Sequence, residues 1–327
     1  MKAWRVHEHG EPSKVLQYDD VPDPEIESGQ LLVRVRSAAA NFPDVLLCRG
    51  EYQIKPPLPF TPGVELCGEV VAVGVGVTGF SVGDRVIGSS ELPSGAFGEL
   101  TVMAAERALS APGVLDDAEA SAFFIGYQTG WFGLHRRAGL RAGETLLVHA
   151  AAGGVGSAAI QLGKAAGATV IGVVGGPEKA DVARALGADV VVDRYAEDFV
   201  SVVKEVTDGR GADVVYDPVG GEAYARSTKC IAFEGRIIVV GFASGTVPSA
   251  ALNHALIKNY SILGLHWGLY HQQDPAAIRR CHEDVSALAE GGLVKPLIGD
   301  RLAADQVANG VQRLADGETV GRIVFAL

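Results

Sequence analysis

The rhythm of apolar and polar positions changes near residue 126. Before it, short stretches of alternating or valine-rich character lie at 31–41, 63–74, 82–88 and 96–103. Proline and glycine cluster between these stretches, as in 52–63. Such a pattern predicts short strands joined by turns, which we interpret as an all-β, barrel-like unit.

After residue 126, short apolar runs alternate with helical patterns. We expect strands at 145–149, 169–174, 189–192, 213–216, 236–240 and 261–265. Helical patterns such as 155–167 and 177–187 lie between them, and both end in glycine. Strands that are apolar on both faces are typical of a covered parallel sheet. Six of them with helical crossovers predict a doubly wound (Rossmann) domain.

The last part of the chain contains two more helical patterns, 274–292 and 303–317, and a final strand at 322–327. We expect this tail to return to the N-terminal β unit. The predicted fold class is therefore α/β with two domains. One is β-rich and contains residues 1–125 plus 266–327, and the other is a Rossmann domain of residues 126–265.

Charge and composition narrow the possible partners. The 327 residues carry a net charge of -11, which disfavours nucleic acid and anionic membranes as partners. We expect no membrane helix and no signal peptide, because the sequence lacks a long apolar span and an apolar N-terminal core. The four cysteines are scattered without a CxxC pair, which is typical of a reducing cytoplasm.

A glycine-rich turn, "HAAAGGVGSAAIQ" (149–161), follows the first strand of the Rossmann pattern and opens a helix. Here Gly153 and Gly154 allow the backbone to approach a pyrophosphate, and Gly156 allows the helix to pack close to the sheet. The helix N-terminus then binds the phosphates. Ala151 stands where the first glycine is usual, which is tolerable if φ is not positive there. The alternative is a strand–helix turn without a ligand.

The end of the second strand indicates which nucleotide binds. Val174 and Gly175 stand where an NAD site usually has an acidic residue for the ribose hydroxyls. Lys179 and Arg194 follow, and cations attract a 2′-phosphate. The sequence therefore favours NADPH over NADH. The alternative for Lys179 is an ordinary solvated helix lysine.

Four segments together resemble the medium-chain dehydrogenase/reductase superfamily: "AAANFPDVLLCRGEY" (38–52), "PFTPGVELCGEVVAVG" (59–74), "VGDRV" (82–86) and "HAAAGGVG" (149–156). The resemblance covers the whole chain and implies a GroES-like catalytic domain beside the Rossmann domain. The zinc enzymes of that superfamily have cysteine and histidine where this chain has Asn41 and Val64. Neither residue is a credible zinc ligand. The "NFPD" and "AAAGGVG" motifs resemble the zinc-independent quinone oxidoreductases, including the zeta-crystallins.

This resemblance implies roles for particular residues. Asn41 lies near the nicotinamide, and Thr129 contacts the cofactor. The pyrophosphate is held by Ala152, Gly153, Gly154, Val155 and Gly156, and the 2′-phosphate is surrounded by Gly175, Lys179 and Arg194. Family members often have tyrosine where Arg194 aligns. Gly241 and Phe242 fall where the family lines the nicotinamide pocket. Arg322 is either a cofactor contact or an exposed arginine of the terminal strand.

Tyr52 is the polar candidate for catalysis. Related enoyl-thioester reductases have a tyrosine in the corresponding region, and a phenol stabilises a developing oxyanion. The alternative is a loop tyrosine that packs on neighbouring prolines. We expect Asp44 to cap the following helix and Glu65 to serve the fold. Trp267 either walls the substrate pocket or belongs to the core or an interface.

The leading hypothesis is an NADPH-dependent quinone oxidoreductase, in which the cofactor carries the chemistry and the protein binds and orients. A rival is a reductase of α,β-unsaturated carbonyls, that is, of enones, enals or enoyl thioesters. A rival of another class is a non-catalytic NADPH-binding protein like the lens crystallins. The resemblance also implies a homodimer that extends the nucleotide sheet through 261–265.

Overall fold

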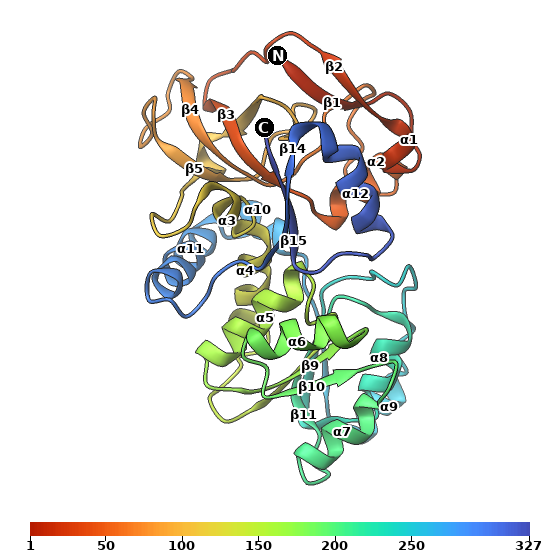
Figure 1. Cartoon of the computed structure of the whole chain (residues 1–327). Coiled ribbons are helices and arrows are strands. Elements are labelled where there is room, and N and C mark those ends of the chain that lie inside the picture. The colour runs from red at the N-terminus through yellow and green to blue at the C-terminus, as the bar shows by residue number, and fades with distance from the viewer. The chain divides into compact units, whose positions relative to one another are not determined.

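The computed structural model describes residues 1–327, which form two compact units (Figure 1). Unit 1 contains Met1–Ile125 and Lys295–Leu327, and unit 2 contains Gly126–Val294. The sequence analysis placed 266–294 with the β-rich domain, whereas in the structure this segment groups with unit 2.

Side-chain contacts explain why this segment belongs to unit 2. The Trp267 indole donates to Oε1 of Gln128 over 3.2 Å, and the ring centroids of Tyr270 and Phe132 are 4.2 Å apart. Asp274 also accepts a hydrogen bond of 3.1 Å from Arg136. These contacts tie the segment to residues 128–136 of unit 2. Helix α11 (Pro275–Glu290) then begins directly after Asp274, which caps it through the Ala277 amide.

Unit 1 is the β-rich unit that was predicted. Its strands are β1 (Lys2–Val6), β2 (Leu16–Asp20), β3 (Gln30–Ala39), β4 (Leu66–Val73), β5 (Arg85–Gly88), β6 (Leu100–Ala104), β7 (Leu109–Ser110), β14 (Ile298–Ala303) and β15 (Arg322–Ala326). β1 and β2 form a two-stranded sheet. The other strands form a sheet in the order β14-β15-β3-β4-β5-β7, with β6 also paired to β3. β15 at the C-terminus lies beside β3 (Figure 1), so the end of the chain returns to the β-rich unit, as the sequence analysis expected.

Short helices cover this sheet. They are α1 (Pro12–Val15), α2 (Phe42–Arg49), α3 (Asp117–Ser121) and α12 (Val307–Ala315), and short 3-10 turns precede or follow some strands. Helix α12 is shorter than the predicted 303–317, because Ala304–Gln306 form a 3-10 turn. The core contains large side chains such as Phe60, Phe97 and Phe325, all fully buried.

Unit 2 contains a parallel sheet of six strands, as predicted. They are β8 (Thr145–Val148), β9 (Thr169–Val174), β10 (Val190–Asp193), β11 (Ala212–Asp217), β12 (Ile231–Val239) and β13 (Ser261–Gly264). Their order is β10-β9-β8-β11-β12-β13. The order reverses between β8 and β11, which is where ligands of doubly wound sheets bind, at the carboxyl ends of the strands.

Helices connect these strands or lie before and after them in the chain. They are α4 (Phe124–Trp131), α5 (Gly154–Ala165), α6 (Pro177–Ala185), α7 (Phe199–Val206), α8 (Gly221–Ser227), α9 (Leu252–Lys258), α10 (Tyr270–Gln273) and α11. Helix α4 spans the boundary between the units and continues into a π-helical turn, Phe132–Arg137. The strand and helix bounds differ by only a few residues from those expected for most elements of this unit, because apolar runs and glycine C-caps mark them clearly.

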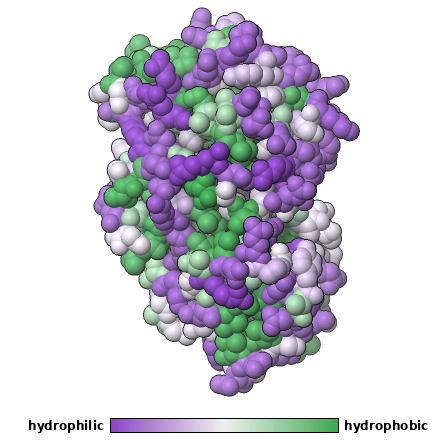
Figure 2. All heavy atoms as spheres, viewed as in Figure 1, coloured by the Kyte–Doolittle hydropathy of each residue, from purple (hydrophilic) through white to green (hydrophobic).

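The surface, the helices and the cysteines add three observations. On the face shown in Figure 2, hydrophilic residues cover most of the surface, with hydrophobic residues in patches between them. No helix has the length and apolar character needed to cross a membrane. The four cysteines are unpaired and buried, and burial raises the pKa of each thiol.

Candidate functional site

The glycine-rich turn lies between β8 and α5, at the carboxyl end of the central strand. Ala151 is fully buried, and its amide donates to the Val173 carbonyl over 3.0 Å. The residue with positive φ in this turn is Ala150, at φ 49, and not Ala151. Position 151 therefore does not require glycine, and alanine is compatible with the backbone of this turn.

The close approach in this turn occurs at Gly156, the third residue of α5. A Cβ at this position would lie 2.2 Å from the Ala150 carbonyl oxygen. The sequence analysis expected Gly156 to allow helix–sheet packing, whereas the atoms it approaches belong to the turn itself. The missing side chain lets the chain fold tightly back on Ala150, which fixes the direction of the first helical amides.

Those amides make the turn suitable for an anion. Helix α5 is 12 residues long and begins after Gly153, its extended N-cap residue. The first amides of a helix have no intrahelical acceptor, and the helix dipole favours negative charge at this end. No acidic residue lies in the first turn of α5. The residues 152–156 thus have the geometry expected of a phosphate-binding turn.

A cationic and aromatic pair stands beside Gly175, directly after β9. The Arg194 guanidinium donates to the Tyr195 hydroxyl over 2.9 Å and lies 4.9 Å from the Tyr195 ring centroid. A Cβ at Gly175 would lie 3.1 Å from both Arg194 and Tyr195. Glycine therefore leaves room for these two side chains to lie over the end of β9. Lys179 lies in the first turn of α6, the helix that follows Gly175.

The Asp193 carboxylate lies near this group, and one of its oxygens binds the backbone. Oδ1 of Asp193 accepts hydrogen bonds from the Gly176 amide at 2.9 Å and the Tyr195 amide at 3.1 Å. These bonds lower the pKa of Asp193, and the bond from the Gly176 amide has the largest effect. Asp193 thus orders the loops that hold Gly175 and Arg194. Sequence reasoning missed both Asp193 and Tyr195, although they directly flank Arg194.

The other predicted residues of unit 2 lie on α4 and after β12. Thr129 is buried in α4, and Gly241 and Phe242 follow the carboxyl end of β12. Phe242 is partly exposed, and its ring lies against Gly220, where an added Cβ would be 2.8 Å away. Hydrogen bonds from Ala243 and Ser244 to residues 218 and 219 hold this loop in place.

In unit 1, three predicted residues form one buried cluster. The Asn41 amide donates to Oε2 of Glu65 over 2.9 Å, and the Arg322 guanidinium also binds Glu65. The Ile125 amide donates to Oε1 of Glu65 over 2.7 Å. Arg322 is 6% exposed, so the alternative of an exposed terminal-strand arginine is wrong. Glu65 joins four segments of unit 1, a role that the sequence indicated only as support for the fold.

Asp44 supports the same region, as expected of a residue at the start of α2. Its carboxylate accepts hydrogen bonds from three backbone amides, those of Asn41 at 2.8 Å, Gly63 at 3.0 Å and Val64 at 3.1 Å. Burial raises the pKa of Asp44 to about 7 against the effect of these bonds. Asp44 therefore fixes the backbone of both Asn41 and the 63–64 segment.

Tyr52 lies in the loop after α2. Its ring packs against the core of unit 1 and is partly buried. Burial, and secondarily the nearby Asp44, raise the pKa of the Tyr52 phenol. The hydroxyl consequently stays protonated at neutral pH, and a protonated phenol is a hydrogen-bond donor.

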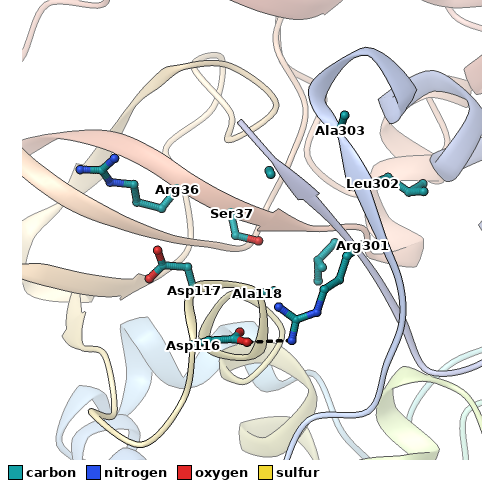
Figure 3. Close-up of a pocket in the computed structure, with 10 residues that line it drawn as sticks. Arg36, Ser37, Asp116, Asp117, Ala118, Arg301, Leu302 and Ala303 are labelled. Atoms are coloured by element: carbon teal, nitrogen blue, oxygen red, sulfur yellow. Dashed lines mark ion pairs between the residues drawn. The ribbon is translucent and has the colours of Figure 1, made fainter.

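A separate hollow of about 430 Å³ lies on unit 1 (Figure 3). It is lined by β3, β14, β15 and the start of α3, and none of the predicted site residues is among its lining residues. Its charged groups are already paired: Arg301 with Asp116, Arg36 with Glu69, and Asp117 with Arg85. We therefore assign it no role.

Comparisons with known proteins agree with this geometry. Residues 27–113 match the alcohol dehydrogenase GroES-like domain, and residues 154–283 match a domain described as zinc-binding dehydrogenase. The chain is 38% identical to a quinone oxidoreductase-like protein 2 homologue of Nematostella vectensis, over 99% of this chain and 89% of that protein. It is also 33% identical to a segment of the phthioceranic/hydroxyphthioceranic acid synthase of Mycobacterium tuberculosis, over 91% of this chain and 14% of the synthase.

A solved structure has the same fold over its whole length. The quinone oxidoreductase of Escherichia coli, crystallised with NADPH, superposes with a TM-score of 0.92 at 29% identity, and the match covers 100% of both chains. The matched domains, the full-length relative and the shared fold lead to one assignment. The chain belongs to the medium-chain dehydrogenase/reductase superfamily of oxidoreductases, among its quinone oxidoreductase-like members.

Proposed function

We propose that this protein is an NADPH-dependent quinone oxidoreductase. The observation that carries the proposal is the group beside β9, where Gly175 leaves space for Arg194 and Tyr195 and one oxygen of Asp193 is bound to backbone amides. Cations attract a 2′-phosphate, and the end of β9 has Val174 and Gly175 in place of the acidic residue that is usual in an NAD site. The E. coli neighbour crystallised with NADPH supports the same cofactor.

The residues of unit 2 fit such a cofactor. Residues 152–156 would bind the pyrophosphate through the first amides of α5, and Gly175, Lys179 and Arg194, with Tyr195 added, would surround the 2′-phosphate. We further infer that Thr129, Gly241 and Phe242 line the nicotinamide half, because they lie on the first helix of the unit and beyond β12. Asn41 and Arg322 are the corresponding candidates in unit 1. When bound, NADPH supplies the hydride.

The protein's own chemistry is then limited to orientation and hydrogen bonding. A quinone has two carbonyl groups that delocalise the added charge, so it needs little acid catalysis. We propose that the protonated Tyr52 phenol donates a hydrogen bond to the acceptor oxygen.

We also infer that the reaction needs no catalytic metal. Position 64 is valine, and the Asn41 amide donates to Glu65 and to the Ala39 carbonyl. A valine side chain has no ligand atom, and a donating amide nitrogen is not a zinc ligand. The expected result is full activity after dialysis against EDTA, and loss of activity that zinc restores would contradict the inference.

A reductase of α,β-unsaturated carbonyls is the second candidate, because the chain resembles a segment of a mycobacterial acid synthase. The test is NADPH oxidation with 1,4-benzoquinone, 9,10-phenanthrenequinone, a 2-enal and crotonyl-CoA. We expect fast turnover with the quinones. Turnover only with crotonyl-CoA would replace the quinone assignment, and NADPH binding without any turnover would indicate a non-catalytic protein.

We propose a homodimer formed through β13, which is an edge strand of the six-stranded sheet. An unpaired edge is a template for another strand. The preceding helix α9 exposes Leu252, Leu256 and Ile257, each by about three quarters of its surface. Such apolar exposure is typical of an interface.

The four unpaired cysteines fit a reducing compartment, and we infer a cytoplasmic protein.

A further inference from the structure

The orientation of the Asn41 side chain is determined by its neighbours. Its Nδ2 atom lies 2.9 Å from Oε2 of Glu65 and 3.1 Å from the Ala39 carbonyl oxygen. A carboxylate and a carbonyl are acceptors only, so they face the NH₂ group and never the amide oxygen. Both hydrogens of the Asn41 amide are therefore directed to protein atoms.

The amide oxygen has a different environment. The backbone N–H of Asp44 donates to the backbone carbonyl of Asn41 at 2.9 Å, and the Asn41 side chain forms no capping hydrogen bond at the start of α2. A side-chain amide oxygen is an acceptor only. The Asn41 side chain, which is 5% exposed, thus retains only the acceptor function of its amide oxygen.

Glu65 is the residue that enforces this orientation. It is fully buried, and the Ile125 amide and the Arg322 guanidinium hold its two oxygens in place. We propose that Glu65 is a positioning residue that keeps both hydrogens of the Asn41 amide turned into the protein, so that Asn41 offers a bound molecule only a hydrogen-bond acceptor.

This proposal rests on the proposed function and makes it more specific. A quinone has only acceptor oxygens, so Asn41 cannot hydrogen-bond to it or stabilise the oxyanion that develops during hydride transfer. A primary amide or a hydroxyl group is a donor and fits the amide oxygen of Asn41. Asn41 is therefore suited to the carboxamide of a nicotinamide or to a hydroquinone product, and any donor to the quinone must come from another residue.

The amino-acid composition permits a direct measurement. The chain has four asparagines, of which Asn253, Asn259 and Asn309 are exposed and only Asn41 is buried. Protein labelled with ¹⁵N in the asparagine side chains gives four pairs of NH₂ signals, and the Asn253→Ala variant helps to assign them. In the free protein we expect slow hydrogen exchange for both Asn41 amide hydrogens and fast exchange for the other three side chains. Fast exchange at Asn41 that slows only after NADPH or 9,10-phenanthrenequinone is added would overturn the proposal.

Two matched variants test the part played by Glu65. E65M/R322M removes one of the two acceptors of the Asn41 side-chain amide without leaving a buried charge unpaired, and R322K keeps the Glu65 carboxylate with a cation beside it. We expect the protection of the Asn41 amide to be lost in the first variant and largely kept in the second. Equal protection in both would show that Glu65 does not position Asn41. Because exchange is measured in the free protein, failure of NADPH to bind would refute the proposed function without affecting this result.

Discussion

Replacing Gly156 with alanine tests whether the turn after β8 binds a phosphate. The new Cβ would lie 2.2 Å from the Ala150 carbonyl oxygen, whereas ordinary contacts lie at 3.4–4 Å. The turn must then open by about 1 Å, and overpacking of this kind costs about 1–3 kcal/mol. Alanine gains about 1 kcal/mol over glycine within a helix. We expect a net loss of stability of roughly 0–2 kcal/mol.

The effect on cofactor binding should be larger than this loss of stability. The shift displaces the first amides of α5, and a hydrogen bond to a charged group contributes about 1.5–3 kcal/mol. Loss of one such bond weakens NADPH binding about 10- to 100-fold. Calorimetric titration with NADPH, at a temperature where the variant is folded, measures this change in affinity. Urea unfolding measures the loss of stability separately.

A matched control lies in the same turn. A Cβ at Gly153 would lie 3.2 Å from the same Ala150 oxygen, and the backbone there is extended, at φ -87 and ψ 177. Alanine therefore fits with a small adjustment, although it is a poorer N-cap residue than glycine. We expect Gly153→Ala to retain most of the affinity for NADPH. If the two variants have the same affinity for NADPH, or lose the same amount of affinity, then the close contact at Gly156 is not the feature that orients the amides.

Four further predictions follow from other contacts. Lys179→Ala should weaken the binding of NADPH about 10- to 100-fold and that of NADH little. Equal losses of affinity for the two nucleotides would show that Lys179 is not part of the 2′-phosphate site. Tyr52→Phe should lower kcat with quinones if the phenol donates to the acceptor, and unchanged rates with every acceptor would discard that role. Burial lowers the pKa of His149 from 6.5 to about 4. Protonation of this residue should therefore lower the free energy of unfolding by about 3 kcal/mol as the pH falls from 6.5 to 4. Urea unfolding should show a flatter pH dependence of stability for His149→Gln than for the unchanged protein. Leu256→Glu on α9 should convert a dimer to a monomer in sedimentation equilibrium, and an unchanged mass would place the interface elsewhere.

The fold was predictable from the sequence wherever a pattern is local. Apolar runs and glycine caps located the six strands of unit 2, because strand and helix periods differ and both are short-range. The segment 266–294 was assigned to the other domain, because its attachment depends on contacts such as Trp267 with Gln128, which are far apart in the sequence. No local pattern carries that information.

The candidate site divides in the same way. The glycine-rich turn after β8 and the lack of an acid at the end of β9 are local features, and the sequence indicated both. The pairing of Arg322 with Glu65 joins residues 257 positions apart and therefore appears only after folding. Asp193 and Tyr195 were visible in the sequence, but nothing in their spacing indicated that one binds the loop amides and the other binds Arg194.

The burial of all four thiols has a consequence for a protein that handles quinones. Quinones and enones are electrophiles that alkylate cysteine, and the thiolate is the form that reacts. Burial raises the pKa of Cys48 and Cys67 to about 12 from 9.0, so their thiolate fraction at neutral pH falls about a thousandfold. Cys230 and Cys281 are equally enclosed. The chain thus exposes no nucleophilic sulfur to its proposed substrates, and it should keep its activity through many turnovers in their presence.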